Sequence, residues 1–350
     1  MNDDLKELID RLCAAHSLSR AEYVRLIEGR SPESAQLLSL RARDARERVY
    51  GKAVYIRGLI EISNICKNDC LYCGIRRSNG ACSRYRLSKA DILAACDEGY
   101  ALGFRTFVLQ GGEDGYFTDD VLCGIVRAIK QAHPDCAVTL SVGERSWESY
   151  AALREAGADR YLLRHETANP EHYAKLHPRE MHYENRMRCL RDLRDLGYQV
   201  GCGFMVGSPY QTAQDLAMAL EFIERFHPEM VGIGPFIPHA ATVFAAEAAG
   251  SVDLTCYLLS IIRLIHPTVL LPATTALGTL DPKGREKGIL SGANVVMPNL
   301  SPPSVRKKYE LYNNKLSDGA ESAQCVQSLK QRMASIGYEV VTDRGDHKKA

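Results

Sequence analysis

SKADILAACDEGYALGFRTFVLQ, residues 88–110, contains the order of elements from which the fold of this chain can be predicted. Ser88 and Asp91 have the spacing of a capping box, with aspartate in place of glutamate, and they open a helical run. Gly103 follows as the residue type that commonly ends a helix. Thr106–Gln110 then has the length and composition of a buried strand.

The same order of helix, glycine and strand recurs along the chain. Gly157 and Gly197 end further helical runs, and short apolar runs follow them. The strand candidates are Val54–Ile62, Thr106–Gln110, Ala137–Val142, Arg160–Arg164, Val200–Val206, Met230–Gly234, Thr268–Leu271 and Ala293–Met297. Strands that alternate with helices in this way predict an α/β fold, a parallel (β/α)8 barrel of the TIM type. The alternative, a doubly wound open sheet, usually stops near about five or six strands.

We expect one barrel domain with additions at both ends. The expected divisions are 1–50, a helical cap that includes Ser31–Tyr50; 51–312, the barrel; and 313–350, with one more helix, Ala320–Ile336, and a polar tail, Asp343–Ala350. The tail offers almost nothing to bury, so we expect it to be disordered.

The composition is that of a soluble globular protein, with 45% hydrophobic and 25% charged residues. The 44 basic and 43 acidic residues leave a formal charge of 44 − 43 = +1, which argues against a general nucleic-acid or anionic-membrane binder. No apolar run approaches the roughly 18 residues of a membrane span. The N-terminal MNDDLKELIDRL does not read as a secretory signal, so we expect a cytoplasmic protein.

Three of the 12 cysteines, Cys66, Cys70 and Cys73, lie within one short stretch of the chain. A structural zinc site usually takes four ligands in two pairs, and a second CxxC is absent from the sequence. Cys82 or a distant histidine remains a possible fourth zinc ligand. Alternatively, three thiolates with this spacing can hold three irons of a 4Fe–4S cluster and leave the fourth iron open.

The functional residues of a parallel barrel lie at the C-terminal ends of its strands. Polar, glycine and proline residues crowd these positions in the sequence. They are Asn64–Cys66, Gln110–Asp114, Ser141–Glu144, Arg164–Thr167, Met205–Ser208, Pro235–His239, Thr274–Thr275 and Met297–Asn299. We therefore predict an active site at this end of the barrel, with the cysteine loop following the first strand.

The cysteine loop resembles the CxxxCxxC signature of the radical S-adenosylmethionine (SAM) enzymes, including the aromatic Tyr72 before the last cysteine. Gln110–Asp114 resembles the glycine-rich GGE motif of the same family, in which glycines allow close approach of the backbone to SAM. The resemblance implies one 4Fe–4S cluster on Cys66, Cys70 and Cys73. It also implies SAM as the second cofactor and reductive cleavage of SAM to a 5′-deoxyadenosyl radical.

The resemblance also implies roles for residues at the predicted rim. Cofactor-binding residues would be Tyr72, Gly111, Gly112, Glu113, Ser141, Glu166, Arg186, Met205, Met230 and Ile237. Residues that bind an anionic group of the substrate would be Thr139, Arg164, Thr274, Thr275 and Tyr309. His165 is either a buried structural histidine or part of the site.

Longer segments resemble the HydE family of FeFe-hydrogenase maturases. They are Glu61–Cys66, Tyr161–Ala168, Met230–His239, Pro272–Ala276 and Ala293–Asn299. The likeness implies a role in assembling the hydrogenase H-cluster from a cysteine-bound iron carbonyl–cyanide precursor. It implies the maturases HydG and HydF and a reductant as partners. Two alternatives remain: an enzyme of the biotin synthase and methylornithine synthase group acting on an amino-acid-like substrate, and a non-catalytic cluster scaffold.

One feature departs from the family pattern. Some HydE proteins carry three further cysteines near the C-terminus that bind an accessory cluster, whereas the segment 313–330 contains only Cys325. One cysteine cannot hold such a cluster, so we predict a single cluster per chain.

Overall fold

The computed structural model describes residues 3–317 and 319–349. The strands are β1 Ala53–Ile56, β2 Gly58–Ser63, β3 Thr106–Gly111, β4 Ala137–Ser141, β5 Arg160–Leu162, β6 Gln199–Cys202, β7 Met205–Val206, β8 Met230–Val231, β9 Gly234–Pro235, β10 Val295–Val296 and β11 Glu339–Val341. The helices are α1 Asp3–Ala15, α2 Arg20–Glu28, α3 Pro32–Tyr50, α4 Lys89–Ala101, α5 Asp119–Ala132, α6 Trp147–Glu155, α7 Pro170–Leu176, α8 Tyr183–Asp195, α9 Ala213–Phe226, α10 Val252–Ile265, α11 Thr275–Leu280, α12 Gly284–Leu290, α13 Pro303–Arg306 and α14 Val326–Ser335, with short 3₁₀ turns at Gly319–Glu321 and Ala323–Cys325.

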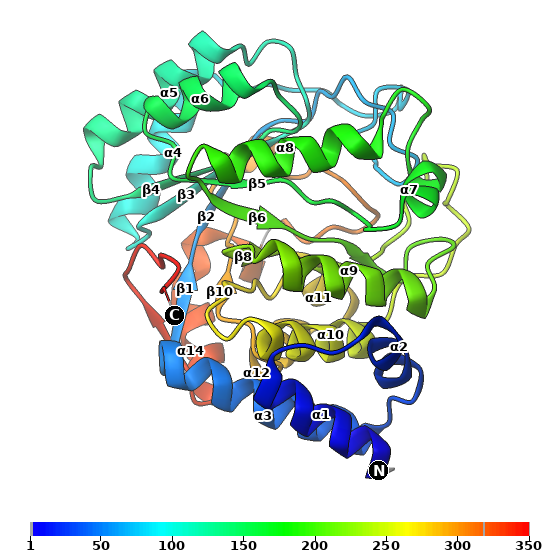
Figure 1. The fold of residues 1–350 in the computed structure, drawn as a ribbon. Helices are drawn as coiled ribbons and strands as arrows, with labels where there is room; N and C mark the ends of the chain where they lie inside the picture. The colour runs from blue at the N-terminus through cyan, green and yellow to red at the C-terminus, as the bar shows by residue number, and fades with distance from the viewer. Residues whose placement is uncertain (1–2, 318, 350) are drawn as a thin grey trace.

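The strands pair in parallel in the order of a barrel, with helices on the outside (Figure 1). The largest sheet runs β2-β3-β4-β5-β6-β8, and β10 pairs with β1. Isolated parallel bridges, Met230 to Leu270 and Pro272 to Val295, continue the pairing from β8 to β10. The predicted α/β fold with a parallel barrel-type sheet is therefore confirmed.

The strands differ from the predicted ones in several places. The first candidate, Val54–Ile62, divides into β1 and β2 at Arg57, and the two parts belong to different sheets. The fifth and sixth candidates each split in two, because Gly203 and Gly232 bring the neighbouring backbones into contact. A Cβ on Gly203, whose φ is +153°, would lie 2.0 Å from the Gly232 carbonyl oxygen. The seventh candidate, Thr268–Leu271, forms only an isolated bridge at Leu270, and a second bridge follows it at Pro272, where proline has no N–H for a regular ladder.

Helix α4 begins as the sequence predicts. The Ser88 side chain accepts from Asp91 N–H, and the Asp91 carboxylate accepts from Ser88 N–H, which completes a capping box. None of the helices in the described ranges combines the length and apolarity needed to cross a lipid bilayer.

The N-terminal helices α1 to α3 pack on the outer helices α9 and α10 (Figure 1). Ser17 and Tyr23 donate hydrogen bonds to the two carboxylate oxygens of Glu224 on α9, at 2.6 and 2.8 Å. Tyr257 on α10 donates to the Leu26 carbonyl at 2.9 Å. This contact extends the hydrophobic core outward from the barrel.

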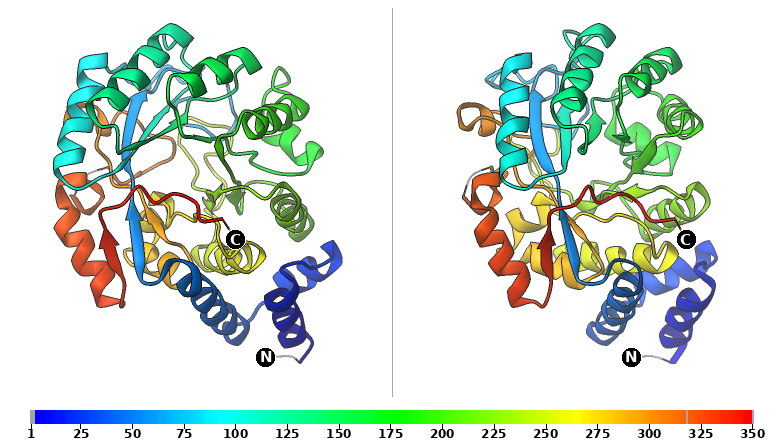
Figure 2. Two further views of the ribbon diagram at one scale, coloured as in Figure 1. Left: turned by 60° about the vertical axis from the view of Figure 1, so that its left-hand side comes forward. Right: turned by 90° about the vertical axis from the view of Figure 1, so that its left-hand side faces the viewer.

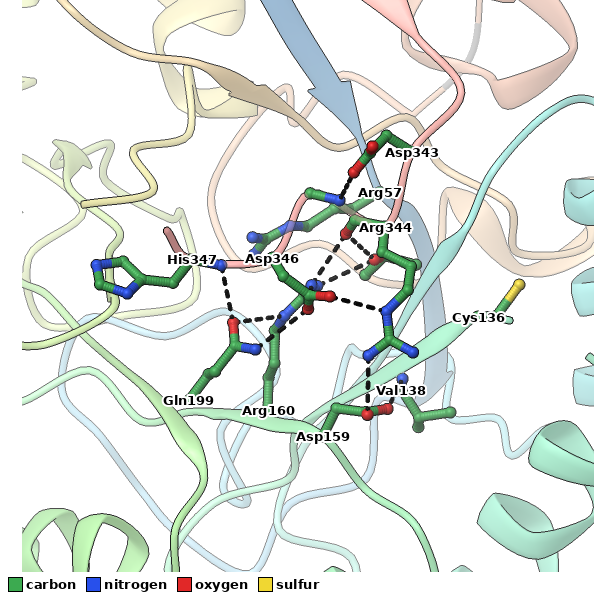
Figure 3. Close-up of polar contacts among 12 residues, drawn as sticks. Arg57, Cys136, Val138, Asp159, Arg160, Gln199, Asp343, Arg344, Asp346 and His347 are labelled. Atoms are coloured by element: carbon green, nitrogen blue, oxygen red, sulfur yellow. Dashed lines mark hydrogen bonds and ion pairs between the residues drawn. The ribbon is translucent and has the colours of Figure 1, made fainter. Parts of the chain in front are cut away.

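The predicted disorder of the C-terminal tail is wrong for its described residues, 343–349, which lie across the N-terminal end of the barrel (Figures 2 and 3). Arg160, the first residue of β5, is fully buried and donates to the Asp346 carboxylate at 2.5 Å. Gln199, the first residue of β6, also donates to Asp346, at 3.1 Å. The tail supplies the negative charge that the buried Arg160 needs. Its polar composition alone gave no indication of this contact.

Helix α14 starts later than the predicted Ala320–Ile336, at Val326. Two 3₁₀ turns precede it, in which Ser322 caps the second by accepting from Gln324 N–H at 3.3 Å. This local side-chain bond competes with a continuous helix.

We expect Asp346→Asn to lower the free energy of unfolding by about 1 kcal/mol at pH 7, a modest value because the carboxylate is 42% exposed. Arg160, beside other donors, lowers the pKa of Asp346 to about 2. A carboxylate whose pKa is depressed by folding stabilises the protein above its unfolded pKa of about 3.9, and this contribution is lost as the pH falls toward 2.

Urea unfolding of both proteins from pH 7 down to pH 3 measures this effect. The difference between Asp346→Asn and the wild type should shrink below about pH 4. Asp343→Asn, in the same tail, serves as the control because the Asp343 carboxylate accepts a hydrogen bond from Gly345 N–H, at 2.6 Å, and forms no ion pair with the described residues. A difference that stays constant over the whole range would contradict the assignment.

Candidate active site

A cavity of about 340 Å³ opens at the C-terminal ends of the strands. Most of the predicted site residues line it: Cys66, Cys70, Tyr72, Cys73, Gly111, Gly112, Glu113, Ser141, Arg164, Glu166, Arg186, Met205, Ile237, Thr274, Thr275 and Tyr309. These residues come from loops that are far apart in the sequence, and the parallel strands bring them to one end of the molecule.

The three clustered cysteines lie in the irregular loop after β2 and face this cavity. The Cys66 thiol accepts from Glu113 N–H at 3.4 Å, and the Cys70 sulfur lies 3.6 Å from the Met181 sulfur. Burial raises the pKa of all three thiols, that of Cys73 to about 12. Within the described part of the chain, no group of three His, Cys, Asp or Glu side chains is arranged about a single metal ion.

The glycine-rich segment after β3 packs directly on the cysteine loop. A Cβ on Gly112 would lie 2.2 Å from the Ile65 carbonyl oxygen and 2.8 Å from the Cys66 Cβ, so only glycine fits there. Glu113 is fixed at both carboxylate oxygens, by Lys67 at 3.0 Å and by Glu144 N–H at 3.1 Å. The segment therefore presents its backbone, rather than its side chains, next to the cysteines.

Buried Glu166 and partly exposed Arg164 form an ion pair just after β5, the fourth predicted strand. Glu166 has a φ of +64°, a left-handed conformation that is strained for a residue with a Cβ and is typical of functional sites. Its Oε2 lies 3.2 Å from Arg164 Nη2 without a hydrogen bond. A buried carboxylate oxygen in this position can still accept a hydrogen bond from a ligand.

Arg186 lies in the first turn of α8 and is buried, not at the exposed surface. Its Nε donates to Glu144 and its Nη1 donates to the Arg164 carbonyl, both at 2.5 Å. The guanidinium also lies over the Tyr173 ring, 5.8 Å from its centroid. These contacts hold the cation at the cavity wall in one orientation.

Thr139 and Met230 do not line the cavity. Thr139 lies two residues before Ser141 on β4, deeper in the barrel, and its buried Oγ1 has no hydrogen-bond partner. Met230 is the first residue of β8 and packs with Tyr55 near the opposite end of the barrel. The residues of this stretch that do line the cavity, Gly234 and Pro235, come four and five positions later, so Met230 lies too early along the strand to reach the site.

His165 is fully buried outside the cavity lining. Its Nδ1 accepts from Gly203 N–H at 3.3 Å, and its ring lies 4.7 Å from that of Phe222. Burial lowers its pKa to about 3, so the ring is neutral at neutral pH. This environment fits the structural role rather than a place in the site.

The structure adds residues to the cavity lining that the sequence did not single out: Glu61, Met181, Tyr312 and Lys315. Lys315 and Glu61 form a buried ion pair at 2.7 Å, in which the cation comes from the C-terminal segment and the anion from β2. The sequence gives no signal for this pair because the two residues are 254 positions apart. Gln110 also lines the cavity, within the predicted rim segment.

The site has the donor set and the unused polar atoms that a cluster and a polar cofactor require. Three thiols face one cavity, and a buried thiolate is a good iron ligand. Several buried polar atoms lack hydrogen-bond partners, among them Arg164 Nε, Glu166 Oε2 and Thr274 Oγ1. Such atoms are costly unless a ligand or water satisfies them.

Comparison with known proteins agrees with this geometry. Residues 60–223 match the family model of the radical SAM superfamily. The chain is 44% identical over 308 residues to the [FeFe] hydrogenase maturase subunit HydE of Thermotoga maritima, covering 88% of each chain. It is 27% identical over 339 residues to 3-methylornithine synthase of Methanosarcina acetivorans, covering 96% of this chain and 94% of that one.

A solved structure supports the fold. The crystal structure of methylornithine synthase (PylB) superimposes with a TM-score of 0.83 at 24% identity, covering 95% of this chain and 97% of that one. The radical SAM superfamily uses a 4Fe–4S cluster together with SAM, which favours the cluster over zinc on these cysteines. The fold, the cysteine loop and the extent of the sequence match agree, and the chain belongs to the HydE family of radical SAM enzymes.

Proposed function

We propose that this protein is a maturase that acts in assembly of the H-cluster of FeFe-hydrogenase, on a cysteine-bound iron carbonyl–cyanide precursor. The observation that carries the proposal is the 44% identity to HydE, which extends over 88% of both chains. The match to methylornithine synthase is longer but much weaker, at 27% identity.

Cys66, Cys70 and Cys73 would hold the cluster, and the glycine backbone beside them would meet SAM. When bound, the cluster and SAM supply a 5′-deoxyadenosyl radical. Glu166 accepts hydrogen bonds from the ribose hydroxyls, since its Oε2, which is paired with Arg164, has no hydrogen bond within the protein. Arg186 pairs with the methionyl carboxylate, since Glu144 holds its guanidinium at the cavity wall.

The remaining proposed SAM contacts surround this position. Tyr72 packs against the adenine, and Glu113, Ser141, Met205 and Ile237 complete the lining. Met230 is left out of this set because it lies near the other end of the barrel.

Arg164, Thr274, Thr275 and Tyr309 bind the anionic part of the substrate, with Thr139 beneath them. The orphan donors of Arg164 and the free hydroxyl of Thr274 support this assignment, since an anion would satisfy them. Tyr309 is buried and lies 3.4 Å from Gln110. The segment that carries Tyr309 and Lys315 helps exclude water, which a carbon-centred radical needs.

HydG would supply the precursor, HydF would be a further partner in maturation, and a reductant would reduce the cluster. Cys325 is the only cysteine of 313–330, so each chain carries one cluster.

Anaerobic maturation of an apo-hydrogenase tests the proposal. The reconstituted chain, SAM, reductant, HydG product and HydF should together restore hydrogenase activity, and omission of the chain should abolish it. Full activation without consumption of SAM would indicate a scaffold instead. Formation of methylornithine from an amino acid by the chain would favour the amino-acid alternative.

We expect Glu166→Gln to weaken SAM binding about tenfold, because the amide replaces a charged acceptor of ribose hydroxyls. Equilibrium dialysis of the cluster-loaded protein measures this affinity. Glu247→Gln, on an exposed loop, should leave it unchanged. Equal affinities of Glu166→Gln and the wild type would remove Glu166 from the SAM site.

A further inference from the structure

The C-terminal end of α7 supports the part of the cysteine loop that carries Tyr72. Leu71 N–H donates to the Leu176 carbonyl at 3.0 Å, which ties the loop to the last residue of the helix. The next residue, His177, is the C-cap of α7 and is buried. The loop has no helix or strand of its own at these positions, so its side chains depend on such external contacts.

The hydrogen bonds of His177 define its tautomer. Nδ1 lies 2.9 Å from the Tyr173 carbonyl oxygen, which can only accept, so Nδ1 carries the proton. Burial lowers the pKa of His177 to about 3, which keeps the imidazole neutral. A neutral imidazole protonated at Nδ1 offers Nε2 as an acceptor.

The Tyr72 hydroxyl lies 3.3 Å from Nε2 of His177, and it is therefore the donor of this bond. The two rings meet edge to face, with centroids 5.4 Å apart and planes at 88°. On another side, Tyr72 packs on an apolar cluster that includes Met205 and Phe236. The hydrogen bond from the Tyr72 hydroxyl to His177 and the apolar packing together hold the Tyr72 ring in one orientation in the cavity wall.

His177 also belongs to a continuous array of rings. Tyr173 stacks on it with a centroid distance of 3.8 Å and an interplanar angle of 17°. Arg186 lies over the far part of this array, 5.8 Å from the Tyr173 centroid. The array thus runs from Arg186 to Tyr72, the residues proposed to meet opposite ends of SAM.

We infer that His177 is a positioning residue, which fixes the Tyr72 ring for contact with the SAM adenine through a hydrogen bond from the Tyr72 hydroxyl to Nε2. The inference rests on the SAM-binding role proposed for Tyr72 above. It assigns to α7 the function of aligning the cysteine loop with the cofactor. His177 acts through Tyr72, since it does not itself line the cavity.

Two isosteric substitutions separate this role from simple packing. His177→Asn keeps a donor at the Nδ1 position for the Tyr173 carbonyl but is too short to accept from Tyr72. His177→Gln places its amide oxygen near the Nε2 position and can accept. We expect SAM affinity, measured by equilibrium dialysis on cluster-loaded protein, to fall about three- to tenfold in His177→Asn and to recover in His177→Gln.

Tyr72→Phe completes the test, because it removes the hydroxyl while keeping the ring. It should weaken SAM binding as much as His177→Asn does, and the double variant should be no weaker than either. The KM for SAM should rise while kcat for 5′-deoxyadenosine changes little, and the iron content should stay at the wild-type level.

Other outcomes would overturn the inference. Equal loss of affinity in His177→Asn and His177→Gln, with a lowered unfolding temperature in both, would assign His177 to packing alone. Unchanged affinity in His177→Asn, with a loss in Tyr72→Ala, would also refute it while leaving the Tyr72 role intact. Unchanged affinity in Tyr72→Ala would show instead that the proposed SAM contact of Tyr72 is wrong.

Discussion

Cys70→Ser is expected to abolish formation of 5′-deoxyadenosine from SAM and dithionite. A 4Fe–4S cluster on three thiolates needs all three, and a serine hydroxyl is a far poorer iron ligand than a thiolate. The change is nearly isosteric, so the loop should keep its fold. Anaerobically reconstituted wild type should hold about four irons per chain, and the variant should hold well under half of that.

Cys82→Ser and Cys325→Ser are the matched controls. Cys82 lies beside the loop, with its sulfur 3.5 Å from Asn64 Nδ2, and Cys325 lies at the start of α14. Both variants should keep wild-type iron and wild-type 5′-deoxyadenosine. Loss of metal from Cys82→Ser, with zinc as the bound metal, would indicate a four-cysteine zinc site. Iron well above four per chain that falls in Cys325→Ser would reveal a second cluster.

The barrel and the cysteine loop were predictable because local patterns encode them. The capping box at Ser88 and the apolar run Thr106–Gln110 each form as expected. Most residues of the site could be predicted because the C-terminal ends of all the parallel strands lie at the same end of the barrel. The predicted seventh strand does not form a regular strand, because Pro272 has no N–H to donate. Single bridges at Leu270 and Pro272 hold this segment in the sheet instead.

Contacts between distant segments were not predictable. Lys315 pairs with Glu61 from a segment 254 positions away, and no pattern around Lys315 indicates this contact. The C-terminal tail has the composition of a disordered segment. It is nevertheless ordered, because its Asp346 pairs with the buried charge of Arg160. A single sequence does not show which buried cation a remote carboxylate neutralises.

The ion pair between Arg285 and Glu321 gives the second large expected effect. Arg285 on α12 and Glu321 in a 3₁₀ turn are 2% and 4% exposed, and Arg285 Nε donates to Glu321 Oε1 at 2.7 Å. Burial lowers the pKa of Arg285 to about 10, so it remains charged at neutral pH. Glu321→Gln leaves that buried cation without its anion, and we expect the free energy of unfolding to fall by about 3–5 kcal/mol.

Replacing both partners should cost much less than replacing one. Arg285→Met combined with Glu321→Leu removes both buried charges and keeps most of the volume, so its stability should lie within about 1–2 kcal/mol of the wild type. Urea unfolding of cofactor-free protein under reducing conditions measures all three proteins. Similar stability of the single variant and the wild type would show that the pair is not desolvated as its burial indicates.

The ion pair also contacts residues of the proposed site. Arg285 Nη2 donates to Thr275 Oγ1 at 3.3 Å, and Asn299 N–H donates to the Glu321 carbonyl at 2.7 Å. Its loss should therefore loosen the proposed substrate hydroxyls together with the C-terminal segment that closes over them.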